Sequence, residues 1–258
     1  MTSKNTLRVI LITVLGFVLH YLLFLNFNSF KIAFDNLTHQ GLTSYIITYF
    51  LIGIPIFAAT NLIDTKKRTS ESLGLSGSIK TGMLFAVIVT LPMFIGGCLF
   101  FDFNSNIDIE NLIAGTFVAG FMEELYYRGF LFGQLFKNTK LGFFSSVFLG
   151  ALIFASGHLY QSYDVTELIG IFTVTFFGAV FFAWLFTEWK YNLWTAIFTH
   201  SFMNLSWNLF EVDNTALGDI KANVFRGLTI VTAIVFTVIY KRRNKEALII
   251  TKSTLFRK

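Results

Sequence analysis

Residues 111–136 read NLIAGTFVAGFMEELYYRGFLFGQLF. This stretch is longer than the roughly 20 mostly apolar residues that a helix needs to cross a bilayer. Near its middle stand three ionisable side chains, Glu123, Glu124 and Arg128. A charge near the bilayer centre costs about 3 kcal/mol on insertion scales, so such residues usually pair with one another or line a polar cavity. The stretch therefore predicts a membrane helix with a polar site inside it.

The composition extends this reading to the whole chain. Of its 258 residues, 54% are hydrophobic, 18% aromatic and only 14% charged, with a mean hydropathy of +0.64. So much apolar surface is typical of a polytopic membrane protein rather than a soluble domain. The predicted spans are residues 7–25, 43–62, 81–101, 111–136, 142–158, 167–187, 193–210 and 223–240. We therefore expect an all-α bundle of about eight transmembrane helices, forming a single integral membrane domain over residues 1–258.

The charged residues between the spans predict the topology. Alternate loops and both ends hold Lys4, Arg8, Lys66, Lys67, Arg68, Lys80, Lys137, Lys140, Lys190, Lys241, Arg242, Arg243 and Lys245. The other loops hold Asp102, Asp108, Glu110, Asp164, Glu211, Asp213 and Asp219, with Lys31, Lys221 and Arg226 as basic exceptions. By the positive-inside rule, both termini lie in the cytoplasm and the number of spans is even.

The net charge of +5 follows from this topology and from attraction to anionic lipids, so it does not indicate nucleic-acid binding. Residues 241–258 form a basic cytoplasmic tail that either lies on the membrane surface or is disordered. A composition rich in Phe, Ile and Asn with two prolines is typical of AT-rich bacterial genomes. We therefore expect a multi-pass protein of the bacterial cell membrane, with the lipid bilayer as its first partner.

Helical spacing separates the two glutamates. Residues four apart lie on one face of a helix, so Glu124 and Arg128 can form an ion pair within one turn. Glu123 points about 100° away around the helix axis. Glu124 and Arg128 are therefore expected to support the structure, and Glu123 is the carboxylate left for chemistry.

Two more polar clusters occur on later predicted helices. Phe154 is followed four residues later by His158, and His200 is followed four residues later by Asn204. A lone histidine in a membrane helix is more often a hydrogen-bonding link between helices than a catalytic group. We assign His20 to that class, because it has no polar partner at helical spacing. Three clusters together are harder to explain in that way and indicate a shared polar cavity.

The residue types in these clusters allow two kinds of hydrolytic chemistry. A carboxylate and an imidazole can act on one water molecule as general base and positioner, while a second imidazole and an amide hydrogen-bond the oxyanion of a tetrahedral intermediate. Alternatively, Glu123, His158 and His200 supply three ligands to Zn²⁺ and leave a fourth position for water. Neither a His-Glu-x-x-His motif nor a Gly-x-Ser-x-Gly motif is present.

Glu123-Glu124-x-x-x-Arg128, Phe154-x-x-x-His158 and His200-x-x-x-Asn204, in this order on separate helices, resemble the CPBP intramembrane protease family. This family is also called the CAAX-protease and bacteriocin-processing or Abi family, and its eukaryotic member is the Ras-converting prenyl-protein endopeptidase. The resemblance covers about residues 110–210, and Leu73-Gly74-Leu75 is a weaker similarity upstream.

The resemblance implies an eight-helix bundle around a polar cavity and an intramembrane endopeptidase of either metallo or glutamate type. It implies that Glu123 and His158 activate water and that His200 and Asn204 hold the oxyanion or a metal. The expected substrate is a small peptide or a membrane-anchored protein, processed in bacteriocin self-immunity or peptide maturation. A catalytically silent immunity factor or scaffold that binds a partner through the same cavity is the alternative. A proton or ion carrier is less favoured, because broken repeats in both halves are absent.

One geometric difficulty follows from the predicted spans. At about 1.5 Å per residue, Glu123, His158 and His200 lie at different depths from the cytoplasmic ends of their helices. Tilted helices, a break near Gly157 or different helix ends must bring the three side chains level. By family resemblance, we expect the cavity to open to the cytoplasmic face.

Overall fold

The computed structural model of the chain describes residues 3–256, and within that range the fold is built from helices without a β-strand. The predicted all-α membrane bundle is confirmed. Among the described residues, six helices are long and apolar enough to cross a membrane. They are α1 (Ser3–Phe24), α3 (Gly41–Ile63), α5 (Ile79–Phe100), α9 (Phe143–Ser156, continued by a 3₁₀ turn to Gln161), α10 (Val165–Glu188) and α12 (Ile220–Arg243). Large apolar side chains along them are exposed, as expected for surfaces that face lipid; Leu15, Ile95 and Phe177 are examples.

The other two predicted spans are helical but differ from the six. Residues 109–138 form one helical path made of α6 (Ile109–Ile113), a π-helical segment (Ala114–Val118), α7 (Ala119–Glu123), a second π-helical segment (Glu124–Phe132) and α8 (Gly133–Asn138). The last helix of the core, α11, runs from Leu193 to Leu209. These two elements carry the glutamates and His200. Single π turns inside helices are common at functional sites, and here one begins at Glu124.

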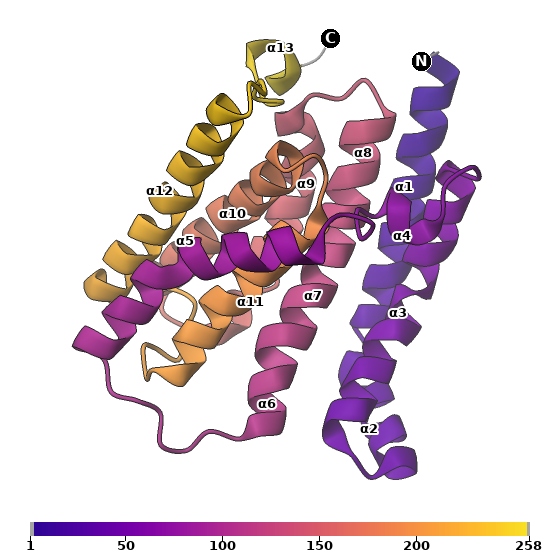
Figure 1. Cartoon of the computed structure of the whole chain (residues 1–258). Helices are drawn as coiled ribbons and strands as arrows, with labels where there is room; N and C mark the ends of the chain where they lie inside the picture. Colours follow the sequence, from indigo (N-terminus) through magenta and orange to yellow (C-terminus); the bar gives the residue numbers. More distant parts are fainter. Residues whose placement is uncertain (1–2, 257–258) are drawn as a thin grey trace.

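Figure 1 shows both chain ends at the same end of the bundle, with α2 (Phe27–Thr38) and α6 at the opposite end. Helices α1 and α3 pack as one pair, and α2 packs against α3 at the end of the bundle opposite the termini. Helix α2 has no buried residue and lies between the first two predicted spans, where no helix was predicted. An even number of passes is consistent with termini on one side.

Helix α11 begins inside the protein rather than at its surface. The Leu193 side chain is completely buried, and its N–H donates to the carbonyl oxygen of Gly74 at 3.0 Å. Gly74 has a φ of +88°, which favours glycine. Gly129 packs so closely on this loop that a Cβ atom there would lie 2.8 Å from the Leu73 carbonyl oxygen. The Leu73-Gly74-Leu75 loop, which follows α4 (Thr69–Ser72), therefore sets the depth of α11 against the motif helix.

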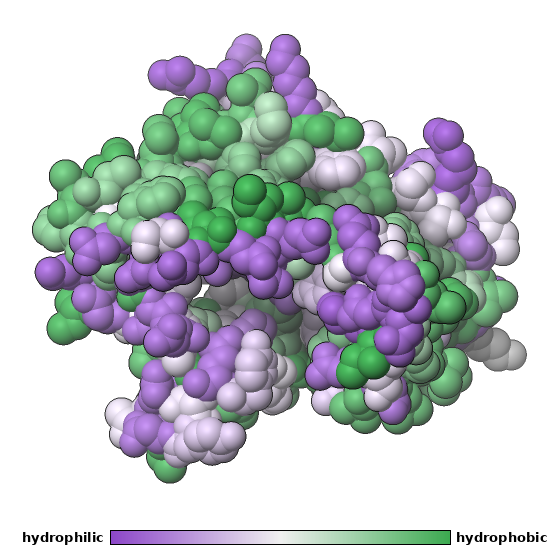
Figure 2. All heavy atoms as spheres, turned by 90° about the horizontal axis from the view of Figure 1, so that it is seen from below, coloured by the Kyte–Doolittle hydropathy of each residue, from purple (hydrophilic) through white to green (hydrophobic). Residues whose placement is uncertain are grey.

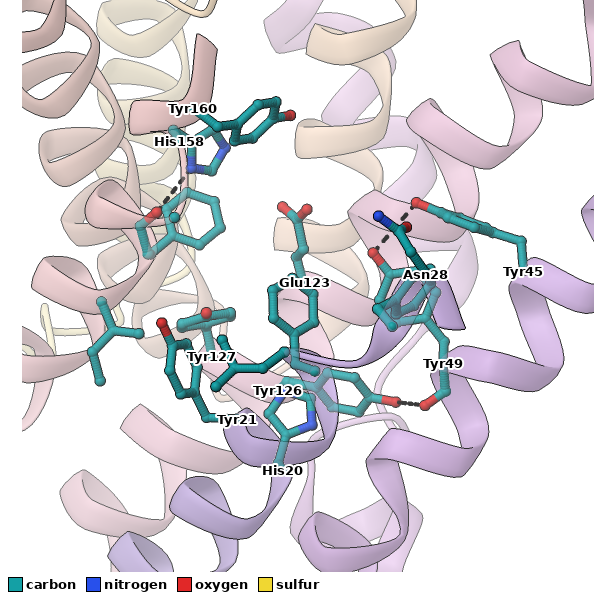
Figure 3. A pocket seen from close by; sticks show the side chains of 16 residues that line it. His20, Tyr21, Asn28, Tyr45, Tyr49, Glu123, Tyr126, Tyr127, His158 and Tyr160 are labelled. Atoms are coloured by element: carbon teal, nitrogen blue, oxygen red, sulfur yellow. Dashed lines mark hydrogen bonds between the residues drawn. The ribbon is translucent and has the colours of Figure 1, made fainter. Parts of the chain in front are cut away.

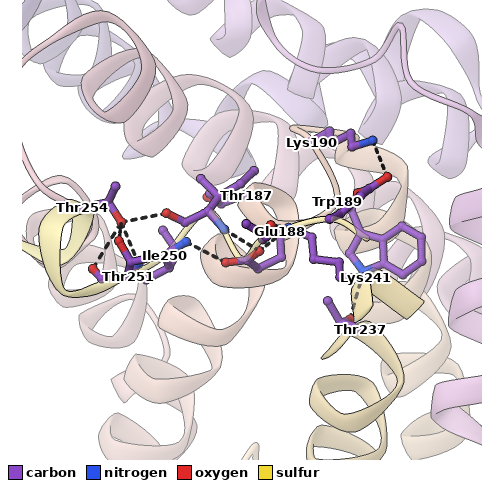
Figure 4. Close-up of polar contacts among 12 residues, drawn as sticks. Thr187, Glu188, Trp189, Lys190, Thr237, Lys241, Ile250, Thr251 and Thr254 are labelled. Atoms are coloured by element: carbon purple, nitrogen blue, oxygen red, sulfur yellow. Dashed lines mark hydrogen bonds and ion pairs between the residues drawn. The ribbon is translucent and has the colours of Figure 1, made fainter. Parts of the chain in front are cut away.

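The C-terminal segment folds back onto the end of α10 (Figure 4). Glu188 is completely buried, pairs with Lys241, and accepts hydrogen bonds from the backbone N–H groups of Ile249 and Ile250 at 3.0 and 2.8 Å. A short helix, α13 (Lys252–Leu255), follows. One buried carboxylate thus holds together α10, α12 and the chain after α12.

Candidate active site

The two glutamates enter different environments although they are adjacent in sequence. The Glu123 side chain is 27% exposed, whereas that of Glu124 is 0% exposed. Glu124 Oε1 lies 3.1 Å from Arg128 Nη1, so the ion pair predicted from helical spacing is present. Water can therefore reach Glu123 but not Glu124.

Glu124, Arg128 and His200 form a buried polar cluster. Glu124 Oε1 also accepts a hydrogen bond from His200 Nδ1 at 2.8 Å, which connects the motif helix to α11. Aromatic rings enclose both side chains: the Arg128 guanidinium lies 4.5 Å from the Phe154 ring centroid, and the His200 ring stacks on Phe182 at 4.9 Å. Because buried charges are costly unless they are paired, this cluster fixes the relative positions of both helices.

The hydrogen bond to Glu124 also determines which His200 nitrogen faces the site. A carboxylate paired with arginine accepts hydrogen bonds, so Nδ1 of His200 carries the proton. The other nitrogen, Nε2, lies 3.9 Å from Glu123 Oε2. That separation is too long for a direct hydrogen bond. His200 therefore presents Nε2 toward the exposed glutamate.

Glu123 projects into a cavity of about 440 Å³ (Figure 3). The cavity is built from the last turn of α1, the start of α2, the start of α3, the motif helix and the end of α9. Its walls are rich in phenol rings, supplied by Tyr21, Tyr45, Tyr49, Tyr126, Tyr127 and Tyr160. Among the described residues that line it, Glu123 is the only carboxylate, and there is no lysine or arginine.

His158 lines the same cavity from the side opposite α3 (Figure 3). Helix α9 ends at Ser156, so a break near Gly157, one of the three alternatives considered above, is present, and His158 directly precedes the 3₁₀ turn that follows. Its Nδ1 donates to the Phe154 carbonyl oxygen at 2.8 Å. Since a carbonyl only accepts, Nε2 of neutral His158 has a free lone pair.

Asn204 lies one turn beyond His200 on α11 and is not among the residues that line the cavity. Its Nδ2 is 3.4 Å from the Gly115 carbonyl oxygen, a long hydrogen bond. The structure therefore brings Glu123, Glu124, Arg128 and His200 into contact, sets His158 across the cavity, and places Asn204 at the seam between α11 and the first π segment.

Several residues of the cavity were missed by sequence reasoning. His20 makes the interhelical bond expected of it, from Nδ1 to the Ile52 carbonyl oxygen at 2.8 Å, yet it also lines the cavity against Tyr126. Tyr126 donates its hydroxyl to the Tyr49 carbonyl oxygen at 2.6 Å. Tyr45 and Tyr49 have the spacing of one helix face, which was the available signal.

A zinc ion would need Glu123, His158 and His200 to converge on one point. Both imidazoles have Nδ1 occupied by a hydrogen bond, which leaves Nε2 for a metal. However, no three His, Cys, Asp or Glu side chains within residues 3–256 are grouped closely enough to hold an ion. The residues do not fit a preformed zinc site in this arrangement.

Comparison with known proteins gives one family match. Residues 106–206 match the family described as type II CAAX prenyl endopeptidase Rce1-like. The matched range contains all three motifs. No curated protein sequence matches the chain.

Proposed function

The motif-bearing core of this chain belongs to the Rce1-like family of CAAX endopeptidases, and from this premise we propose that the protein is a glutamate-dependent intramembrane endopeptidase. The observation that carries the proposal is the position of Glu123. Within the described residues it is the one carboxylate that lines the cavity, and His158 lines the same cavity from across it. A water molecule and a peptide carbonyl placed between them would meet a base and a second proton acceptor.

In the proposed reaction, Glu123 takes a proton from water as the water oxygen attacks the scissile carbonyl carbon. The His158 Nε2 lone pair accepts the second hydrogen of that water and orients it. When the tetrahedral intermediate collapses, the C–N bond breaks and Glu123 returns its proton to the leaving nitrogen. The products are a carboxylic acid and an amine, and Glu123 is regenerated.

His200 and Asn204 are the proposed oxyanion donors. With Nδ1 bonded to Glu124, the oxyanion role requires a proton on Nε2 as well. Asn204 would have to exchange its long bond to Gly115 for the substrate. The Glu124–Arg128 pair positions His200 and does not contact the substrate.

The proposed substrate is a short peptide or a segment of a membrane-anchored protein. A role in bacteriocin self-immunity or peptide processing in a bacterial cell membrane, with both termini in the cytoplasm, fits the family and the charge distribution. Zinc has no step in this proposal, since the three candidate ligands do not converge.

The test compares peptides released from membranes that contain wild-type, Glu123→Gln or His158→Gln protein at equal abundance. We expect fragments that depend on wild type, with Glu123→Gln lowering their formation by at least about 100-fold, the usual effect of losing a general base. Identical peptides and phenotypes from folded Glu123→Gln protein would reject proteolysis and favour the non-catalytic scaffold or immunity factor.

A further inference from the structure

The cavity lies in the half of the bundle that is remote from the chain termini. It is lined by the end of α1 with the turn after it, by the starts of α2 and α3, and by the end of α9. In Figure 1 these helix ends lie opposite the N- and C-termini. Figure 2 views the molecule from this end and shows hydrophilic side chains gathered around a recess.

The termini end of the bundle is the basic one. The loops and helix ends there hold Arg8, Lys66, Lys67, Arg68, Lys80, Lys137, Lys140, Lys190, Lys241, Arg242, Arg243, Lys245 and Lys252. At the cavity end the bases are Lys31, Lys221 and Arg226, among several aspartates and glutamates. Lys31 is paired with Asp35 at 2.6 Å, which further reduces the basic character of that end. Lysine and arginine mark the cytoplasmic side of a membrane protein.

We infer that the cavity opens on the non-cytoplasmic side of the membrane, so that its substrate is a peptide segment presented from that side. That the occupant is a substrate rests on the proposed function, but the side to which the cavity opens does not. It differs from the cytoplasmic opening that the family resemblance favoured.

The rim of the cavity supports a substrate held near the lipid surface. Leu25 and Tyr160 at the rim are 64% and 80% exposed. Beside them lies α2, which has no buried residue and exposes the apolar side chains of Ile32 and Leu37. Such a helix is suited to the interface between headgroups and acyl chains. A segment anchored in the outer leaflet would therefore reach Glu123 along α2.

The lining indicates the charge of that segment. Within the described residues, Glu123 is the only carboxylate that lines the cavity, and no lysine or arginine lines it. The tyrosine rings offer apolar faces, attraction for cations, and hydroxyl groups for hydrogen bonds. A neutral or basic peptide segment fits this cavity, and an acidic one would be repelled.

The test is cysteine labelling in intact cells with a membrane-impermeant maleimide. The single native cysteine, Cys98, is first replaced by serine. Tyr160→Cys tests the rim, and Tyr163→Cys, at a position that is 99% exposed just beyond it, provides a second reporter if the first variant folds poorly. Lys67→Cys, at a side chain that is 54% exposed, reports the termini end.

We expect both tyrosine positions to react in intact cells, and Lys67→Cys to react only after permeabilisation. The opposite pattern would overturn the inference. Labelling requires no catalysis, so the same pattern in a Glu123→Gln background separates failure of this inference from failure of the proposed function. Labelling Tyr160→Cys from outside should also block peptide processing. Labelling Tyr163→Cys should leave the processing rate at more than about half of that of the unlabelled variant. Equal inhibition of the two variants would argue against substrate entry past Tyr160.

Discussion

Glu123 and Glu124 illustrate how one residue of separation assigns opposite roles. The first carboxylate reaches a water-accessible cavity, and the second is sealed between Arg128 and His200. Their helical angle could be read from the sequence, because it depends only on the periodicity of the helix. The groups that surround each carboxylate could not be read from the sequence, because they come from distant helices.

This difference predicts different effects of the same substitution. Glu124→Gln removes the counter-ion of a buried arginine and should lower the free energy of unfolding by about 3–5 kcal/mol. Glu123→Gln, at a 27% exposed side chain, should change it by less than about 1 kcal/mol while abolishing activity. Thermal unfolding in detergent measures the first effect and peptide release the second. A Glu124→Gln protein as stable as wild type would contradict the structural role of this pair.

Metal removal tests the water-activating groups. A chelator should leave the rate of peptide release unchanged, since Glu123 supplies the base and the donors do not converge on an ion. The control is a known zinc peptidase, treated in the same membranes, which must lose activity. Loss of release by the present protein with recovery on added Zn²⁺ would show that the site rearranges around a metal.

At the scale of the elements, the site depends on the close approach of the motif helix to the Leu73-Gly74-Leu75 loop. Gly129→Ala would place a methyl group 2.8 Å from the Leu73 carbonyl oxygen, so backbone must move. We expect a loss of about 1–3 kcal/mol and a large loss of activity, because α11 and His200 shift with the loop. Gly115→Ala on the same helical path meets nothing within 4 Å and is the matched control. Equal stability of the two variants would refute this packing.

The Glu188–Lys241 pair joins α10, α12 and the chain after them. Glu188→Gln leaves a buried lysine without its counter-ion and should cost about 3–5 kcal/mol. The double variant Glu188→Gln/Lys241→Gln removes both charges and should recover much of that loss. Thermal unfolding of the two variants provides the comparison. No recovery in the double variant would mean that the backbone bonds of Ile249 and Ile250, rather than the charge pair, dominate.

At the scale of the whole molecule, the termini share one end of the bundle (Figure 1). Reporters fused to the two ends should therefore both respond in the cytoplasm, as the positive-inside rule predicts. The measurement is paired fluorescent and alkaline-phosphatase fusions at each terminus. Termini reporting from opposite sides would require an odd number of passes and would invalidate the arrangement.

The sequence alone determined the membrane class, the all-α fold, the family motifs and the ion pair of the motif helix. Hydropathy and helical periodicity are local properties, so they can be read along one segment at a time. The depth of the histidines in the bundle could not be read from one segment, because it depends on where their helices begin and end. His200 reaches Glu123 because α11 begins at the buried Leu193, and His158 reaches the cavity because α9 ends at Ser156.

Only the tertiary structure decided which side chains share the cavity and toward which end it opens. The tyrosines of α1 and α3 and the ring of His20 belong to helices outside the motifs. The spacing of Tyr45 and Tyr49 indicates a shared helix face, but it does not show that this face lines a cavity. Their role arises where distant helix ends meet, and this packing depends on the shapes of all the facing surfaces at once. Local patterns thus fixed the elements and the chemistry available, while helix packing fixed the site.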